Sequence, residues 1–149
     1  MDKILGGYQA LQIRLLNGRI FQKLLNKEPD AQYRSEQGKI LTILWKQELG
    51  CATATDIALA TGLANNTLTS MVKKLEEQGL VTIQPCTQDK RKKYISLTEL
   101  GWAQKEIGDH VSKELGEIFY QGFSDQEIRE FEAYQERIIT NLKAKENDM

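Results

Sequence analysis

The sequence has few of the residues that build disulfide frameworks, metal sites and catalytic centres. Its 149 residues include two cysteines, Cys51 and Cys86, and a single histidine, His110. Neither cysteine belongs to a CxxC pair, which argues against a disulfide framework and against a zinc site. We find no nucleophile–histidine–carboxylate set and no phosphate-binding glycine loop. The sequence therefore predicts a protein that is not an enzyme and that needs no metal or cofactor.

Long apolar runs are missing as well, and so is a strong net charge. No run approaches the roughly 20 apolar residues of a membrane helix, and polar residues interrupt the N-terminal segment, so we expect no signal peptide and a cytoplasmic protein. The net charge of −1 hides a regional difference, because residues 34–98 carry +3 and residues 99–149 carry −6. A basic segment can mark a nucleic-acid-binding face, although an excess this small also arises by chance.

Proline is scarce, and it occurs where the helical pattern breaks. Apolar residues at helical spacing predict one long helix that ends before Pro29. A second helix is expected from about Ser35, as N-cap, to a stop near Gly50. After Thr98, a further N-cap, the pattern predicts two long helices, the second opened by a capping box at Ser124. The apolar faces of the terminal helices are longer than one small core needs, so we expect them to pack on a second subunit.

The middle of the chain has the outline of a helix-turn-helix. Thr53 and Asp56 resemble a capping box that opens a short helix. Gly62 lies in a tight turn, and a longer helix is expected from about Asn65 to Gln78.

The longer helix of this pair has one apolar and one polar face. Leu68, Met71, Val72 and Leu75 recur at helical spacing and are predicted to point into the core. The polar side carries mostly hydrogen-bond donors: Asn65, Asn66, Thr69, Ser70, Lys73 and Lys74, with Glu77 as the exception. A nucleic-acid-reading face and an ordinary solvent-facing side remain alternatives for this helix taken alone.

A run of cations lies between two β-favouring segments, residues 80–83 and 94–97. The run consists of Lys90, Arg91, Lys92 and Lys93. This arrangement predicts a β-hairpin with the cations at its tip. Asp89 is placed to accept a hydrogen bond from the Arg91 guanidinium and to hold it in one pose.

The order of these elements predicts a mainly α fold with a small β-hairpin wing. We expect a winged helix-turn-helix DNA-binding domain over residues 34–98, and a helical dimerisation region made of residues 1–33 and 99–149. In such a module the second helix of the pair enters the major groove, and an arginine at the hairpin tip can enter the minor groove. A two-fold dimer would then match a palindromic site.

Three segments match a known pattern in order and spacing: SEQGKILTILW, DIALATGLANNTLTSMVKKLEEQGLV and DKRKKYISLTELG. With them the chain resembles the MarR family of transcriptional regulators over nearly its whole length. The last segment is the most specific, because the family has an Asp-x-Arg pair at the wing tip, then a strand ending in Leu-Thr, then a glycine. Those positions are filled here by Asp89, Arg91, Leu97, Thr98 and Gly101.

The resemblance implies a homodimer that binds a pseudo-palindromic operator, with repression as the family default. It implies that Arg91 reaches the minor groove, that Asp89 orients it, and that the start of the recognition helix faces the major groove. The predicted DNA contacts are Asn65, Asn66, Thr67, Thr69, Ser70, Lys73, Lys74, Asp89, Lys90, Arg91, Lys92 and Lys93. The chain departs from many members at Ser70, where they have arginine, and at Ile83 and Gln84, where they have basic residues. Lys92 and Lys93 can compensate through phosphate contacts, which add affinity without sequence information.

Family members commonly release DNA when a small, often aromatic or phenolic, ligand binds between the dimer helices and the DNA-binding lobe. Such a ligand acts through its different affinity for two geometries. Candidate lining residues are Tyr8, Leu11, Leu15, Trp45 and Trp102, for which ordinary core packing is the alternative.

Two other functions remain open at the level of sequence. Cys86 lies close to cations in the wing and would suit a redox-responsive regulator. A helical protein-interaction module without DNA binding would explain the long terminal helices, but not the cations at a hairpin tip.

Overall fold

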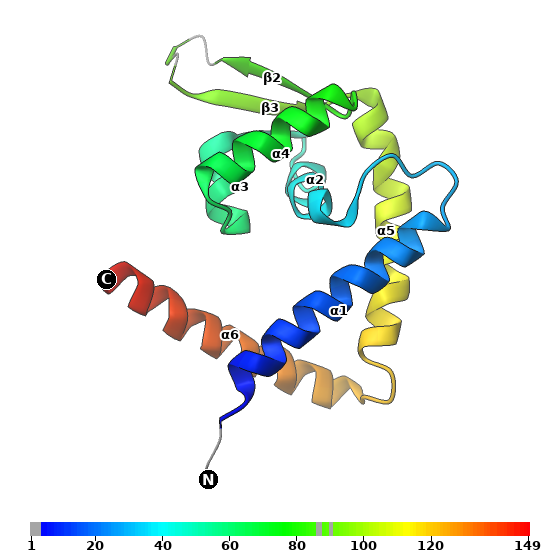
Figure 1. Ribbon diagram of the computed structural model, residues 1–149, viewed down its shortest axis with the longest axis vertical. Coiled ribbons are helices and arrows are strands. Elements are labelled where there is room, and N and C mark those ends of the chain that lie inside the picture. The colour runs from blue at the N-terminus through cyan, green and yellow to red at the C-terminus, as the bar shows by residue number, and fades with distance from the viewer. Residues whose placement is uncertain (1–3, 86–87, 90) are drawn as a thin grey trace. The chain divides into compact units, whose positions relative to one another are not determined.

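The expected class, mainly α with a small antiparallel sheet, is confirmed in the computed structural model, which describes residues 4–85, 88–89 and 91–149 (Figure 1). The helices are α1 (Gly6–Asn26), the 3-10 turn η1 (Ser35–Gln37), α2 (Gly38–Trp45), α3 (Ala54–Thr61), α4 (Asn65–Glu77), α5 (Glu99–Phe119) and α6 (Asp125–Asp148). The strands are β1 (Cys51–Thr53), β2 (Val81–Pro85) and β3 (Lys93–Leu97). The chain divides into two compact units, one extending to Leu115 and the other covering Gly116–Met149.

The first unit contains the hydrophobic core. Leucine, isoleucine and valine side chains from α2, α3, α4 and the sheet fill it, and Ile40, Leu44, Ile57 and Leu75 are completely buried. On α4 the buried residues are Leu68, Val72 and Leu75, as the helical spacing predicts. This packing fixes which side of α4 faces solvent.

The sheet has one more strand than the sequence pattern indicates. Its order is β1-β3-β2, and all pairs are antiparallel. The hairpin of β2 and β3 pairs Val81 with Leu97 at its base and Pro85 with Lys93 near its tip, and it projects from the helical part of this unit (Figure 1). Strand β1 escaped prediction because three residues are too short to show the alternation that marks a strand.

Two helix boundaries also differ from the sequence-based expectation. Ser35 does not cap the second helix, because the chain first makes the turn η1. The Gln37 N–H donates to the Arg34 carbonyl and the Arg34 N–H donates to the Gln37 side chain, which closes that turn. Gly50 does not end α2, which stops at Trp45. Gly50 instead adopts a left-handed φ of 62° just before β1, and the ring of Trp102 occupies the space where a side chain would lie.

The second unit is built around aromatic contacts and α6. Phe119, Tyr120 and Phe131 pack against one another with ring centroids 4.9 to 6.3 Å apart. The predicted capping box is present at Ser124, whose Oγ accepts from the Glu127 N–H at 3.1 Å while Glu127 accepts from the Ser124 N–H at 2.9 Å. None of the 24 residues of α6 is buried.

None of the helices in the described ranges is both long enough and apolar enough to cross a membrane.

Candidate nucleic-acid interface and effector cavity

The polar face of α4 is open to solvent along its whole length. Every residue predicted to contact DNA from this helix is exposed: Asn65, Asn66, Thr67, Thr69, Ser70, Lys73 and Lys74. No acidic residue occurs in the first turn, where the free backbone N–H groups and the positive end of the helix dipole favour an anion. The face therefore offers donors and positive charge, which suit a phosphate backbone and base edges.

Local contacts define where α3 begins and where it turns into α4. The Thr53 hydroxyl accepts from the Asp56 N–H at 3.1 Å and so caps α3 as predicted. Gly62, with a φ of 76°, ends α3 and makes the tight turn into α4. A left-handed glycine at this point lets two short helices meet without strain.

The base of the wing is joined to the start of α5. The Thr98 hydroxyl donates to the Gly79 carbonyl at 2.6 Å and accepts from the Gly101 N–H at 3.1 Å. Gly101 lies so close to the sheet that a Cβ there would be 2.1 Å from the Leu80 carbonyl oxygen. The Trp45 indole N–H donates to the Gly101 carbonyl at 3.0 Å, so one glycine position connects the wing, α2 and α5.

Asp89 and Arg91 form a clamp at the tip of the wing. Asp89 Oδ1 accepts from the Arg91 backbone N–H at 3.0 Å and from Arg91 Nε at 3.2 Å, and Oδ2 accepts from Nη2 at 3.4 Å. These bonds to Arg91 lower the pKa of Asp89, so the carboxylate is charged at neutral pH. The Arg91 side chain is 92% exposed. The guanidinium is held along its Nε–Nη2 edge while the side chain is open to solvent, an arrangement that suits entry into a narrow, electronegative groove.

The remaining wing residues divide into two groups. Lys92 and Lys93 are exposed beside the clamp. Cys86 and Lys90 lie outside the described residues. The redox role of Cys86 and the phosphate contact of Lys90 therefore remain predictions.

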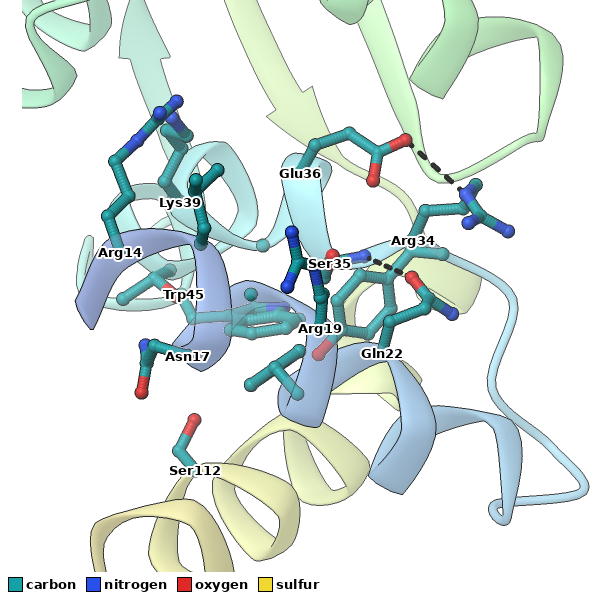
Figure 2. Close-up of a pocket in the computed structure, with 16 residues that line it drawn as sticks. Arg14, Asn17, Arg19, Gln22, Arg34, Ser35, Glu36, Lys39, Trp45 and Ser112 are labelled. Atoms are coloured by element: carbon teal, nitrogen blue, oxygen red, sulfur yellow. Dashed lines mark hydrogen bonds and ion pairs between the residues drawn. The ribbon is translucent and has the colours of Figure 1, made fainter. Parts of the chain in front are cut away.

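A cavity of about 660 Å³ lies in the first unit between α1, η1, α2 and α5 (Figure 2). Trp45 and Tyr33 form an aromatic wall, with ring centroids 5.9 Å apart in an edge-to-face arrangement. Burial, helped by the nearby charge of Asp109, raises the pKa of Tyr33 to about 12. The phenol is therefore neutral and able to donate at physiological pH.

Cations dominate the rim of this cavity. Arg14 and Arg19 come from α1, Arg34 from the segment before η1, and Lys39 from α2, whereas Glu36 is the one acidic residue in the lining (Figure 2). Arg34 pairs with Glu36 at 3.4 Å. Within the described part of the chain, the other three cations make no ion pair with protein groups. The cavity thus combines an aromatic wall with an excess of positive charge, which suits a planar anion.

The structure brings only two of the five predicted ligand-binding residues to this cavity. Leu15 and Trp45 line it. Tyr8 and Leu11 are exposed on the first turns of α1, outside the lining. Trp102 covers Gly50 instead, because the absence of a side chain at that glycine leaves room for the indole.

The sequence-based prediction missed the polar lining of the cavity. A polar stripe on α1 carried the signal: Arg14, Asn17, Gly18 and Gln22 recur at helical spacing and all line the cavity.

Residues 34–93 match the family model described as MarR family. The chain contains a MarR-family domain over these residues. MarR-family regulators are non-enzymatic DNA-binding transcription factors. The match covers the region that contains α4 and most of the wing, and it confirms the resemblance recognised in the sequence.

The individual proteins that the chain is similar to are distant from it in sequence. The HTH-type transcriptional repressor IacR of Pseudomonas putida is 26% identical over 102 residues, which cover 68% of this chain and 61% of IacR, less than two thirds of its length. The Staphylococcus aureus MepR–DNA complex is similar in fold, with a TM-score of 0.83, 22% identity, and coverage of 93% of this chain and 99% of MepR. Bordetella bronchiseptica BpsR, whose DNA binding is regulated by 6-hydroxynicotinic acid, has a TM-score of 0.76, 21% identity, and coverage of 92% and 99%.

Proposed function

We propose that this MarR-family protein is a homodimeric repressor that binds a pseudo-palindromic DNA operator and releases it when a small aromatic anion occupies the cavity beside α1. The observation that carries the DNA-binding part is the pairing of two exposed features on one small module. These features are the donor-rich face of α4 and the Asp89–Arg91 clamp at the wing tip. IacR is a repressor and MepR forms a DNA complex, which supports the same reading.

The proposed roles follow from the chemistry of each side chain. Asn65, Asn66, Thr67, Thr69 and Ser70 read base edges in the major groove, where amide and hydroxyl groups can both donate and accept. Lys73, Lys74 and the wing lysines contact phosphates and contribute sequence-independent affinity. Arg91 enters the minor groove and Asp89 restricts its conformation.

The effector part rests on the lining of the cavity. A planar ring can pack against Trp45 and Tyr33, while a carboxylate of the same molecule meets Arg14, Arg19 or Lys39. BpsR responds to 6-hydroxynicotinic acid, which has the same combination of ring and carboxylate. We therefore expect an aromatic carboxylate rather than a neutral phenol.

Selection of bound fragments from random duplex DNA tests the DNA-binding part. We expect enrichment of a sequence with two inverted half-sites about 10 base pairs apart, or a multiple of that spacing. Affinity for the selected duplex should fall steeply between low and physiological salt, because counterions are released from the phosphates. Recovery of no sequence, together with binding that ignores salt, would count against a DNA-binding function.

A matched pair of substitutions tests the effector part. Benzoate and 6-hydroxynicotinate should displace the protein from the selected duplex, and benzamide should not. Arg19→Ala should weaken the response to the acids by roughly tenfold, the effect of losing one charge-assisted hydrogen bond. Lys23→Ala removes a cation from the same helix outside the cavity and serves as the control. An equal response in both variants would place the effector elsewhere.

A further inference from the structure

We propose that a glutamine relay, made of Gln37, Gln78 and Gln104, connects the cavity to the recognition helix α4, with Gln37 and Gln78 as positioning residues. The proposal rests on the proposed function and adds the path by which the two sites affect each other. It also explains why Gln37 and Gln104 are buried although the other buried residues in the described ranges are nearly all apolar.

The relay begins in the wall of the cavity. Arg34, Ser35 and Glu36 line the cavity, and Gln37 is the next residue of the same turn. Gln37 is only 3% exposed, and its Oε1 accepts from the Arg34 N–H at 2.9 Å. On the other side of the turn the Ser35 N–H donates to Gln22 of α1 at 2.8 Å (Figure 2). A ligand that displaces this turn therefore displaces Gln37.

The next step reaches the end of the recognition helix. Gln37 Nε2 donates to Gln78 Oε1 at 2.6 Å, a bond between residues 41 positions apart. Gln78 is the C-cap residue of α4, and its Nε2 donates to the Gln32 carbonyl at 3.1 Å. A single side chain at the end of α4 thus holds both η1 and the loop that leads into it.

The loop that leads into η1 is also hydrogen-bonded to α5. The Gln32 N–H donates to Gln104 Oε1 at 2.8 Å, and Gln104 Nε2 donates to the Asp30 carbonyl at 3.2 Å. Gln104 is 2% exposed. Leaving a buried side-chain amide without a hydrogen-bond partner costs free energy. We therefore expect the loop to be either hydrogen-bonded to Gln104 or released from it, with few positions in between. Two discrete arrangements of this kind are what coupling between distant sites requires.

Coupling is reciprocal, so DNA can replace the unidentified effector as the probe. Amide hydrogen exchange is measured with and without the selected duplex in wild-type protein, in Gln78→Met and in Gln47→Met. Methionine matches glutamine in length but forms neither bond. Gln47 is exposed and donates to Ile43 within its own segment, so its replacement is the matched control.

In wild type and Gln47→Met, DNA should slow exchange along α4 and also, by about tenfold, at the Gln32 and Arg34 N–H groups. In Gln78→Met the slowing should persist on α4 and fall below about twofold at the loop. Gln78→Glu keeps an acceptor for Gln37 but loses the donor to Gln32, so it should restore the effect at Arg34 and not at Gln32.

Two results would overturn the relay: no slowing at the loop of DNA-bound wild type, or equal slowing at the loop in Gln78→Met, which indicates direct contact with DNA. Absence of slowing on α4 itself would instead contradict the proposed DNA-binding function, so the two failures are distinguishable.

Discussion

At the scale of single residues, Arg91 combines a fixed pose with high exposure. Its backbone N–H and the Nε–Nη2 edge of its guanidinium make three hydrogen bonds to Asp89, while its side chain is 92% exposed. Arg91→Ala should weaken binding to the selected duplex by roughly 1–3 kcal/mol, the effect of losing one strong groove contact. Lys92→Ala, the control, should lower affinity evenly across sequences and flatten the salt dependence. Wild-type affinity in Arg91→Ala, measured by fluorescence anisotropy, would show that the wing does not enter a groove.

Asp89→Asn separates the role of Asp89, which orients the guanidinium, from the role of Arg91, which contacts the groove. Asparagine keeps one acceptor for Arg91 but loses the negative charge that strengthens the contact. We expect a smaller loss of specific affinity than in Arg91→Ala. The same clamp predicts a pH effect. The pKa of Asp89 is lowered, so the ion pair between Asp89 and Arg91 persists at neutral pH and through the ordinary range of carboxyl titration. It is lost only when the pH falls through the lowered pKa of Asp89. A larger loss in Asp89→Asn than in Arg91→Ala would assign Asp89 a direct role.

Individual contacts show where sequence reasoning succeeds at this scale. The Asp89–Arg91 contact could be predicted because its partners are two residues apart and have opposite charges. The contacts of Gln37 with Gln78 and of Gln104 with the loop could not, because their partners are 41 to 74 positions away. Glutamine is also usually exposed, so the local sequence gives no indication that these two side chains are buried.

At the scale of elements, the close approach of α5 to the wing gives a sharp test of packing. In Gly101→Ala the new Cβ would lie 2.1 Å from the Leu80 carbonyl oxygen, so the helix or the strand must move. We expect a loss of about 1–3 kcal/mol in the free energy of unfolding, with weaker DNA binding because the base of the wing shifts. Gly116→Ala, in the same helix with no atom within 4 Å of the new Cβ, should be neutral or stabilising by up to about 1 kcal/mol. Chemical denaturation compares the two, and equal stability would refute the close approach.

Element types were predictable wherever a repeating pattern ran long enough. The buried stripe of α4 and the cap of α3 follow from spacing within 4 to 13 residues. The strand β1 and the turn η1 are three residues each and lack such a pattern. Strand β1 depends on pairing Cys51 with Ser96, a contact that only the folded chain creates. The cavity was predicted only in part, because its walls come from four elements that only the folded chain brings together.

At the scale of the whole molecule, the exposed apolar faces of the terminal helices support a homodimer. The helix α6 buries no residue, and Tyr134, Ile138 and Leu142 recur along one side with 57%, 53% and 65% exposure. α1 also leaves Tyr8, Leu11 and Leu16 exposed. Apolar stripes of this length are stable in water when a second copy covers them.

A charge on that stripe should therefore separate the subunits. In Ile138→Asp/Leu142→Asp, two carboxylates would be buried against apolar side chains of the partner, which is unfavourable enough to dissociate the dimer. Thr140→Asp adds a carboxylate to the opposite side of the same helix and should remain dimeric. Sedimentation velocity gives the oligomeric state. The double variant should bind the full palindrome at least about tenfold more weakly than wild type while keeping its affinity for an isolated half-site, because only the linkage between two DNA-binding modules is lost. A double variant that stays dimeric would move the interface away from α6, and a wild-type protein that sediments as a monomer would remove the physical basis for a palindromic operator.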